Sequence, residues 1–275
     1  MKIAVTGANG FIGSALVAFL KESGHDVFCW QRSGNNTVHY DLKNRTLPEV
    51  SGLNVVIHTA YIPFSTKHPN AAALNIEGTL RLKAACDAAG VFFVYLSSMS
   101  AHQNALSAYG KHKWQLQRQL SGACVIRPGL VVGKGGLFGK MMANVKKWPV
   151  QPVIAGGRQP LQIVALTDLV KAIEQFALAK RDGVFTIATS RVYTMRGVLA
   201  AIAQHFHKKI HFLNLPYRLI AAMLHIILFM RIPLPVSNEN LLGLKQLQPE
   251  NNEADLQLLG WKLKELEEAL FELRD

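Results

Sequence analysis

The first 24 residues of the chain constrain its fold more than any other segment. Residues 2–7 (KIAVTG) form an apolar run that predicts a buried strand. Residues 11–24 carry apolar side chains at helical spacing and end in a glycine, which predicts a helix with a glycine cap. Between the two lies TGANGFIG, in which three glycines recur at every third position. Such a turn, leading from a strand into a helix, is the structural context of a dinucleotide-phosphate site.

Each glycine of this turn has its own expected role. Gly7 permits the tight turn, Gly10 lets the backbone approach a pyrophosphate, and Gly13 lets the helix pack closely on the strand. The free N–H groups and partial positive charge of the helix N-terminus would then hold the phosphates. The cofactor-binding residues predicted here are Gly7, Asn9, Gly10, Phe11, Ile12 and Gly13. The alternative is a structural turn that binds nothing.

The end of the second predicted strand, HDVFCWQR, bears on which dinucleotide would bind. A carboxylate at this position accepts bonds from the ribose hydroxyls of NAD, whereas an arginine accommodates the 2′-phosphate of NADP. Here the strand ends in Gln31, Arg32 and Ser33, with no acid. Arg32 can pair with a phosphate and Ser33 can donate to it. We therefore predict NADP(H) as the preferred cofactor, with NAD(H) as the alternative. The alternative for Arg32 is a solvated loop residue that binds no phosphate.

Predicted strands and helices alternate from residue 2 to about residue 133. Further strands are expected at 54–61, 91–98 and 123–133, and helices at 71–90 and 107–122. This alternation predicts an α/β fold of the Rossmann type, a doubly wound parallel sheet with helices on both faces. More strands and helices follow, ending in an amphipathic segment at 255–274. We expect an NAD(P)-binding domain at 1–165 and a small C-terminal substrate-binding lobe at 166–275, interwoven with the first.

The chain carries 30 basic and 18 acidic side chains, a formal charge of +12, which favours anionic partners. No block of consecutive basic residues and no nucleic-acid-binding motif occurs, so nucleic acid is not expected as a partner. The three cysteines lie far apart in apolar runs. Three histidines that lie close to one another in the sequence match no spacing of zinc ligands. We expect buried thiols and no metal. These residues are Cys29, Cys86 and Cys124, and His205, His207 and His211.

Two features concern the membrane and the compartment. The apolar stretch within residues 219–230 is too short for a membrane span, and a helix packed within the protein is preferred over one that touches a bilayer. The chain begins MKIAVTG, without a signal-peptide pattern, so a cytoplasmic protein is expected.

A serine, a tyrosine and a lysine near the middle of the chain form a candidate acid/base centre. Ser98 ends a predicted strand, and Tyr109 and Lys113 lie four residues apart on the following helix, hence on one face. A neighbouring ammonium and an oxidised nicotinamide would lower the pKa of Tyr109. The phenol could then exchange a proton with an alcohol or carbonyl as hydride moves, while Ser98 holds the oxygen. Lys113 would also bond the nicotinamide ribose.

TGANGFIG and YLSSMS…AYGKHK resemble the glycine motif and the Ser…Tyr-x-x-x-Lys centre of the extended short-chain dehydrogenase/reductase superfamily, over residues 1–175. The resemblance implies catalytic roles for Ser98, Tyr109 and Lys113. It implies substrate contacts by Ser98, Ser100 and Tyr109. Further cofactor-binding residues implied are Asp41, Leu42, Thr59, Ala60, Tyr61, Asn75, Lys113, Arg127, Pro128 and Gly129. Two departures stand out: Tyr61 replaces the final alanine of an H-x-A-A motif, and the span from Ser98 to Tyr109 is short.

The resemblance also implies the reaction. It is hydride transfer at a secondary alcohol or ketone of a nucleotide sugar, by a 4-epimerase or a 4-keto-reductase. A homodimer would form through the helices that start near Asn75 and Tyr109. The family's dehydratases carry acidic residues beside the catalytic serine, where this chain has Met99 and Ser100. Two alternatives stay open: a reductase of a non-sugar carbonyl compound, and an NADP(H)-binding redox sensor or assembly protein without turnover.

Overall fold

A computed structural model describes residues 1–34, 37–63, 70–215 and 248–274. The chain divides into two compact units, each assembled from separate segments. The first unit comprises Met1–Pro128, Leu166–Ile187 and Ala254–Lys262, and the second comprises Gly129–Ala165, Ala188–Glu253 and Leu263–Asp275. The expected division was an NAD(P)-binding domain at 1–165 with an interwoven lobe at 166–275; in the structure 129–165 belongs to the second unit and 166–187 to the first.

The first unit is built on a seven-stranded sheet whose neighbouring strands are all parallel. Its order is β11-β6-β5-β4-β1-β2-β3. The strands are β1 (Lys2–Thr6), β2 (Asp26–Gln31), β3 (Val38–His39), β4 (Val55–His58), β5 (Phe92–Leu96), β6 (Cys124–Pro128) and β11 (Gly183–Ile187). The strand order reverses at β1, the position at which open parallel sheets bind their ligands.

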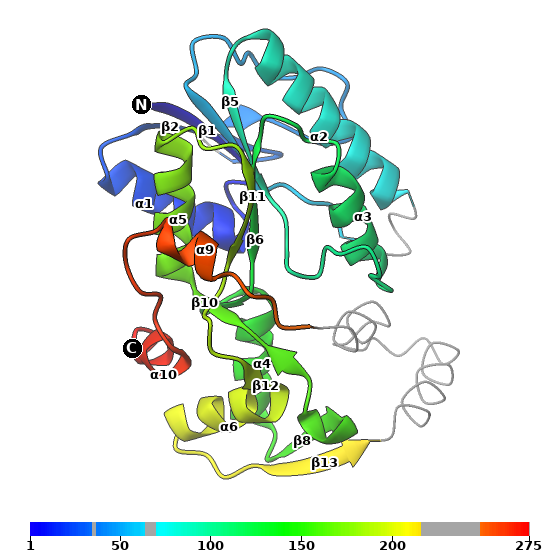
Figure 1. Ribbon diagram of the computed structural model, residues 1–275, viewed down its shortest axis with the longest axis vertical. Helices are drawn as coiled ribbons and strands as arrows, with labels where there is room; N and C mark the ends of the chain where they lie inside the picture. The colour runs from blue at the N-terminus through cyan, green and yellow to red at the C-terminus, as the bar shows by residue number, and fades with distance from the viewer. Residues whose placement is uncertain (35–36, 64–69, 216–247, 275) are drawn as a thin grey trace. The chain divides into compact units, whose positions relative to one another are not determined.

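Helices cover both faces of this sheet, which confirms the doubly wound Rossmann-type fold. On one face α1 (Phe11–Glu22) packs against α5 (Leu166–Leu178), and on the other α2 (Ala71–Ala88) packs against α3 (Ala108–Gln117) (Figure 1). The sheet is buried between them, so strands such as β4 consist wholly of buried residues. The short helix α9 (Glu253–Gln257) follows late in the chain.

The register of the sheet aligns the carboxyl ends of the strands that carry the candidate site. Thr6 at the end of β1 lies beside both Trp30 on β2 and His58 on β4. His58 in turn lies beside Tyr95 on β5. Side chains that follow these strands therefore gather at one edge of the sheet.

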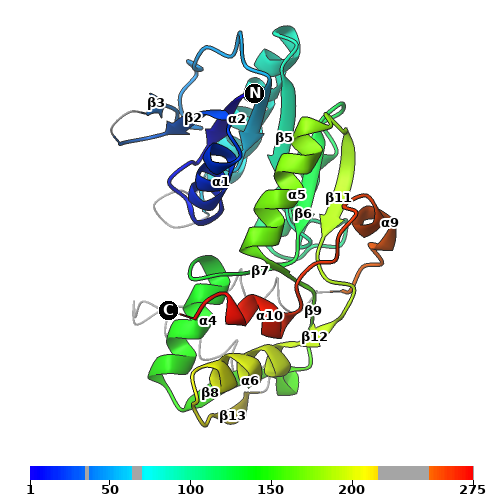
Figure 2. The same ribbon diagram turned by 90° about the vertical axis from the view of Figure 1, so that its left-hand side faces the viewer.

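The second unit packs short strand pairs against helices α4 (Gly136–Lys147), α6 (Met195–His205) and α10 (Leu266–Phe271) (Figure 2). Its strands are β7 (Leu130–Val132), β8 (Val150–Ile154), β9 (Pro160–Leu161), β10 (Ile163–Ala165), β12 (Tyr193–Thr194) and β13 (His211–Leu215), and η1 (Ala155–Gly157) is a 3₁₀ turn. They form the pairs β10-β7, β12-β9 and β13-β8. Phe138 and Ile202 are fully buried in its core. Complete burial of one such side chain stabilises a fold by about 1.5–3 kcal/mol.

One expected strand is interrupted by a glycine. The single strand expected at 123–133 is split at Gly129 into β6 and β7, which join different sheets. A Cβ on Gly129 would lie 2.4 Å from the carbonyl oxygen of Gln162, so only a bare backbone fits there. The amphipathic segment at 255–274 contains two short helical stretches, with Gly260 at φ +72° between them.

The apolar stretch at 219–230 lies outside the described residues. Among the residues that the structure does describe, no helix is long and apolar enough to cross a membrane. No group of three or more His, Cys, Asp or Glu side chains in that same part of the chain could hold a metal ion.

Candidate active site

The glycine turn is held rigidly at the carboxyl end of β1. Gly7 has φ +67° and donates its N–H to the carbonyl of Trp30 at 2.9 Å. A Cβ on Gly13 would lie 2.2 Å from the carbonyl oxygen of Gly7, so α1 approaches the turn as closely as a backbone allows. The N-cap residue Gly10 supplies no side-chain bond, and the first turn of α1 holds no acid. These features fit a pyrophosphate bound to the N–H groups of α1.

The remaining residues of the turn lie where a ligand could reach them. Asn9 is exposed, and Phe11 and Ile12 are partly exposed in the first turn of α1. All three predicted positions thus lie beside the N–H groups that the turn presents.

The tip of β2 places Arg32 and Ser33 in the open. Both residues are exposed, and the carbonyl oxygen of Arg32 lies 3.1 Å from Nδ1 of His39, within hydrogen-bond distance. The side chain of Gln31 lies against Gly34. Its Nε2 is only 2.4 Å from the position that a Cβ on Gly34 would occupy. Arg32 thus leaves the strand with its guanidinium accessible to an anionic ligand.

Asp41 and Leu42, predicted to reach the adenine, are also used within the protein. The Asp41 carboxylate accepts a bond from the N–H of Lys43 at 3.0 Å. Leu42 is buried and packs against Gly78 of α2. A Cβ on Gly78 would lie 2.7 Å from Cδ2 of Leu42. Leu42 is therefore a packing residue, and Asp41 closes its own turn.

Behind the glycine turn, a buried histidine ties three elements together. Nδ1 of His58 lies 2.8 Å from the hydroxyl of Thr6 on β1, and its Nε2 lies 3.0 Å from that of Thr79 on α2. Burial, and secondarily the charge of Lys113, lowers the pKa of His58 to about 3, so the ring is neutral at physiological pH. Thr59 donates to the carbonyl of Thr6 at 2.7 Å, and the N–H of Ala60 donates to the Thr6 hydroxyl at 3.2 Å. This network fixes the end of β4.

Asn75 on α2 is a buried brace for the segment after β4. Its Oδ1 accepts from the N–H of Ile62 at 2.8 Å, and its Nδ2 donates to the carbonyls of Ile62 at 2.9 Å and Ala71 at 2.7 Å. All these bonds are internal to the protein. The contacts of Asn75 support a positioning role on the chain that carries Tyr61.

The three predicted catalytic residues meet in the structure. Ser98 follows β5, Tyr109 lies in the first turn of α3, and Lys113 lies one turn further along. The Ser98 side chain forms a hydrogen bond with the Tyr109 phenol. The ammonium nitrogen of Lys113 donates to the carbonyl of Leu96 at 2.6 Å and lies 5.9 Å from the centre of the Tyr109 ring. Ser107 caps α3 by accepting from the N–H of Gly110 at 3.1 Å.

The electrostatics of this centre differ from the expectation that a neighbouring ammonium lowers the pKa of Tyr109. Burial raises the pKa of Tyr109, and only the hydrogen bond from Ser98 lowers it. Burial also lowers the pKa of Lys113 to about 7. The lysine is therefore a weak source of positive charge at neutral pH, so in the protein by itself the phenol keeps its proton.

Aromatic rings enclose Lys113. Its ammonium lies 4.5 Å from the centre of the Tyr95 ring and 5.0 Å from that of Tyr61, while Tyr61 packs edge-on against Tyr109 at 5.2 Å. Tyr61, the residue that departs from the H-x-A-A motif, is thus in direct contact with the predicted acid/base. The sequence analysis missed Tyr95, which looked like a strand residue of the core; a lone phenol within the apolar run 91–96 was the available signal.

Arg127, which is predicted to contact the cofactor, also holds the turn after Ser98. Its guanidinium donates to the carbonyl of Ala101 at 3.1 Å and to the hydroxyl of Thr186 on β11 at 3.3 Å. The carbonyl of Pro128 accepts from the N–H of Met99 at 3.2 Å. Gly129 belongs to the second unit, where it packs on Gln162.

The short span between Ser98 and Tyr109 is a compact turn. The N–H of Ser100 donates to the Ser98 hydroxyl at 3.1 Å, so Ser100 supports the serine through its backbone. A Cβ on Gly110 would lie 2.3 Å from the carbonyl of Ser100, and α3 therefore packs directly against the turn. The Ser100 hydroxyl remains a predicted substrate contact.

Comparison with known proteins places these features in a family. The sequence model of the family described as "NAD dependent epimerase/dehydratase family" matches residues 3–188. A 2-alkyl-3-oxoalkanoate reductase of Stenotrophomonas maltophilia is 34% identical over 121 residues, covering 38% of this chain and 36% of that protein. The match thus spans about a third of the relative's length.

Solved structures share the fold at low identity. A human epimerase family protein with NADPH has a TM-score of 0.79 and 20% identity, covering 99% of both chains. A UDP-glucose 4-epimerase with UDP-glucose from Thermotoga maritima has a TM-score of 0.73 and 20% identity, covering 99% of this chain and 97% of that one. Together with the family match over 3–188, the glycine turn and the Ser98–Tyr109–Lys113 arrangement show that this chain belongs to the NAD dependent epimerase/dehydratase family.

Proposed function

We propose that this protein is an NADP(H)-dependent oxidoreductase or epimerase that acts on a secondary alcohol or ketone of a nucleotide sugar, as a 4-keto-reductase or 4-epimerase. The observation that carries the proposal is the meeting of Ser98, Tyr109 and Lys113 at the edge of the sheet that also holds the glycine turn. Pure binding of a dinucleotide does not need a phenol hydrogen-bonded to a serine.

The residues of this centre can perform the protein's part of the reaction. A bound nicotinamide cofactor supplies or accepts the hydride at the substrate carbon. In the direction of reduction, Tyr109 enters with its phenolic proton, because burial raises its pKa, and donates that proton to the substrate oxygen. Ser98 donates a hydrogen bond to the same oxygen and holds it toward the phenol. In the direction of oxidation the substrate hydroxyl gives its proton to the Tyr109 phenolate, so the phenol must first have lost its own proton.

A second candidate is a reductase of a non-sugar carbonyl compound. The 34% identity over 121 residues with a 2-alkyl-3-oxoalkanoate reductase supports it. The chemistry at Tyr109 is the same in both cases, since each substrate presents a ketone. Compartment and assembly also stay predictions: a cytoplasmic homodimer formed through α2 and α3.

The substrate class can be tested with one panel. Purified protein and NADPH are mixed with a 4-keto nucleotide sugar or a 2-alkyl-3-oxoalkanoate, and the loss of NADPH absorbance is followed. UDP-glucose is incubated separately and the mixture is analysed for UDP-galactose. We expect turnover with at least one sugar nucleotide. Turnover of the oxoalkanoate alone would establish the second candidate, and tight NADPH binding without any turnover would contradict both.

We predict that Arg32→Ala weakens NADPH binding about tenfold or more and leaves NADH binding unchanged, because a charge-assisted bond to phosphate contributes about 1.5–3 kcal/mol. Binding is measured by the fluorescence of the reduced cofactor. Arg45→Ala, which removes another exposed arginine of the first unit, serves as the control. If the wild-type protein binds NADH more tightly than NADPH, or if the affinity for NADPH falls equally in both variants, Arg32 does not select the cofactor.

A further inference from the structure

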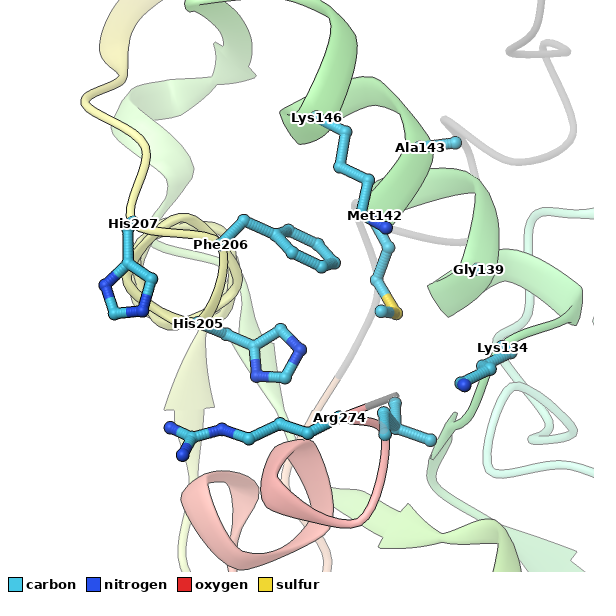
Figure 3. A pocket seen from close by; sticks show the side chains of 10 residues that line it. Lys134, Gly139, Met142, Ala143, Lys146, His205, Phe206, His207 and Arg274 are labelled. Atoms are coloured by element: carbon cyan, nitrogen blue, oxygen red, sulfur yellow. The ribbon is translucent and has the colours of Figure 1, made fainter.

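A cavity in the second unit is lined by none of the candidate site residues. Its volume is about 560 Å³, within the range of about 300–1,000 Å³ typical of small-molecule sites. Figure 3 shows side chains of α4 and of the end of α6 facing this space, with the segment after α10 closing another side. The described part of this unit thus contains a second space of ligand size with its own lining.

The charge of the cavity is strongly one-sided. Lys134, Lys146 and Arg274 line it together with two histidines, His205 and His207, and no acidic residue is among its described lining. Glu272, two residues before Arg274, forms an ion pair with Lys264 at 2.9 Å. The C-terminal end of α6 contributes a partial negative charge of about half a unit, which is smaller than the charge of the Lys146 ammonium alone. A concave surface of one sign concentrates ions of the opposite sign.

The rest of the lining is apolar and aromatic. The Phe206 ring has the Lys146 ammonium 4.2 Å from its centre and the His205 ring packed against it at 4.7 Å. Met142 presents its thioether to the same space (Figure 3). An inorganic anion would make no contact with these apolar and aromatic side chains. A flat ring against Phe206 and Met142 would cover it, with the anionic group toward the lysines.

We propose that this cavity binds a dissolved small molecule that carries a phosphate group on a planar ring. Lys134 and Lys146 hold the phosphate, and Phe206 and Met142 contact the ring. The proposal concerns the second unit alone, so it stands whether or not the reaction proposed above is correct.

Phenyl phosphate tests the site directly. The full-length protein is labelled with ¹³C at its methionine methyl groups, and Met142→Leu identifies the Met142 signal. We expect phenyl phosphate to shift this signal saturably, and benzyl alcohol, which has the ring without the charge, to leave it in place. In the double variant Lys134→Gln/Lys146→Gln, the Kd for phenyl phosphate should rise about tenfold or more, because two charge-assisted bonds are lost. The two single variants give the same direction if the pair proves unstable.

The matched control removes two charges from α4, the helix that carries Lys146, at positions that do not line the cavity. Lys140 and Lys147 are exposed on α4 and do not line it. Lys140→Gln/Lys147→Gln should leave the Kd within about twofold, since neither side chain lines the cavity and salt screens exposed charges. An unmoved Met142 signal, equal weakening in both pairs, or an equal shift with benzyl alcohol would overturn the proposal. A response to anionic lipid vesicles but not to phenyl phosphate would overturn it as well.

Discussion

Replacing Tyr109 with phenylalanine is expected to lower kcat by about 10²- to 10⁴-fold, the usual contribution of a positioned acid or base. The change removes one oxygen and leaves the ring in place. The edge-on contact with Tyr61 and the cap of α3 at Ser107 therefore remain. The phenylalanine cannot protonate the substrate oxygen or accept the bond from Ser98. Because cofactor contacts are expected from the glycine turn and Arg32, the Kd for NADPH should stay within about twofold.

Tyr40→Phe is the matched control for this variant. It makes the same chemical change at another buried phenol of the first unit, whose hydroxyl has no hydrogen-bond partner among the described residues. Its kcat should equal that of the wild type. Comparing NADPH oxidation and NADPH binding in the two variants separates chemistry from folding. If Tyr109→Phe keeps the wild-type kcat, Tyr109 is not the proton donor.

Replacing Lys113 with methionine is expected to stabilise the cofactor-free protein at low pH, although it should impair catalysis. Burial lowers the pKa of Lys113 from its ordinary value of 10.5 to about 7. Between pH 7 and pH 10.5, the amine of Lys113 is protonated in the unfolded chain and neutral in the folded protein. Stability therefore rises as the pH goes from 7 to 10.5, and the full cost of the buried ammonium remains below pH 7.

The size of the effect follows from two opposing contributions. Each unit of pKa shift corresponds to about 1.4 kcal/mol, whereas losing the bond from Lys113 to Leu96 costs about 1–3 kcal/mol. We expect a net gain on the order of 2 kcal/mol at pH 6 that has disappeared by pH 10. Thermal unfolding at several pH values measures it. Lys111→Met, on an exposed position of α3, should show no such trend. A difference in Tm between Lys113→Met and wild type that is independent of pH would contradict the buried-charge account.

The parts of the site that the sequence predicted are close together along the chain. Gly7 and Gly13 are six residues apart, and Tyr109 and Lys113 differ by one helical turn, so local spacing was enough to place them. The partners of Arg127 were not predictable in this way. They are Ala101 and Thr186, far from it in sequence, and only the pairing of β6 with β11 brings Thr186 near.

The pKa of Tyr109 in the cofactor-free protein could not be predicted for a related reason. Spacing placed Lys113 beside Tyr109, but it said nothing about how deeply either side chain is buried. The ring of Tyr95 on β5 and the ring of Tyr61, in the segment after β4, exclude water from the ammonium. Similarly, the split of 123–133 at Gly129 depends on the carbonyl of Gln162, a contact that no local pattern signals.

Because each unit is assembled from separate segments of the chain, neither can fold completely early in translation. The edge strand β11 of the first unit appears only at residues 183–187, and Leu266 and Leu270 of the second unit's core follow about 80 residues later. A nascent chain that has just completed residue 165 therefore lacks parts of both units. Neither unit can reach its final packing before residues 254–274 have been made, so a ribosome stalled earlier would expose apolar surface from each of them.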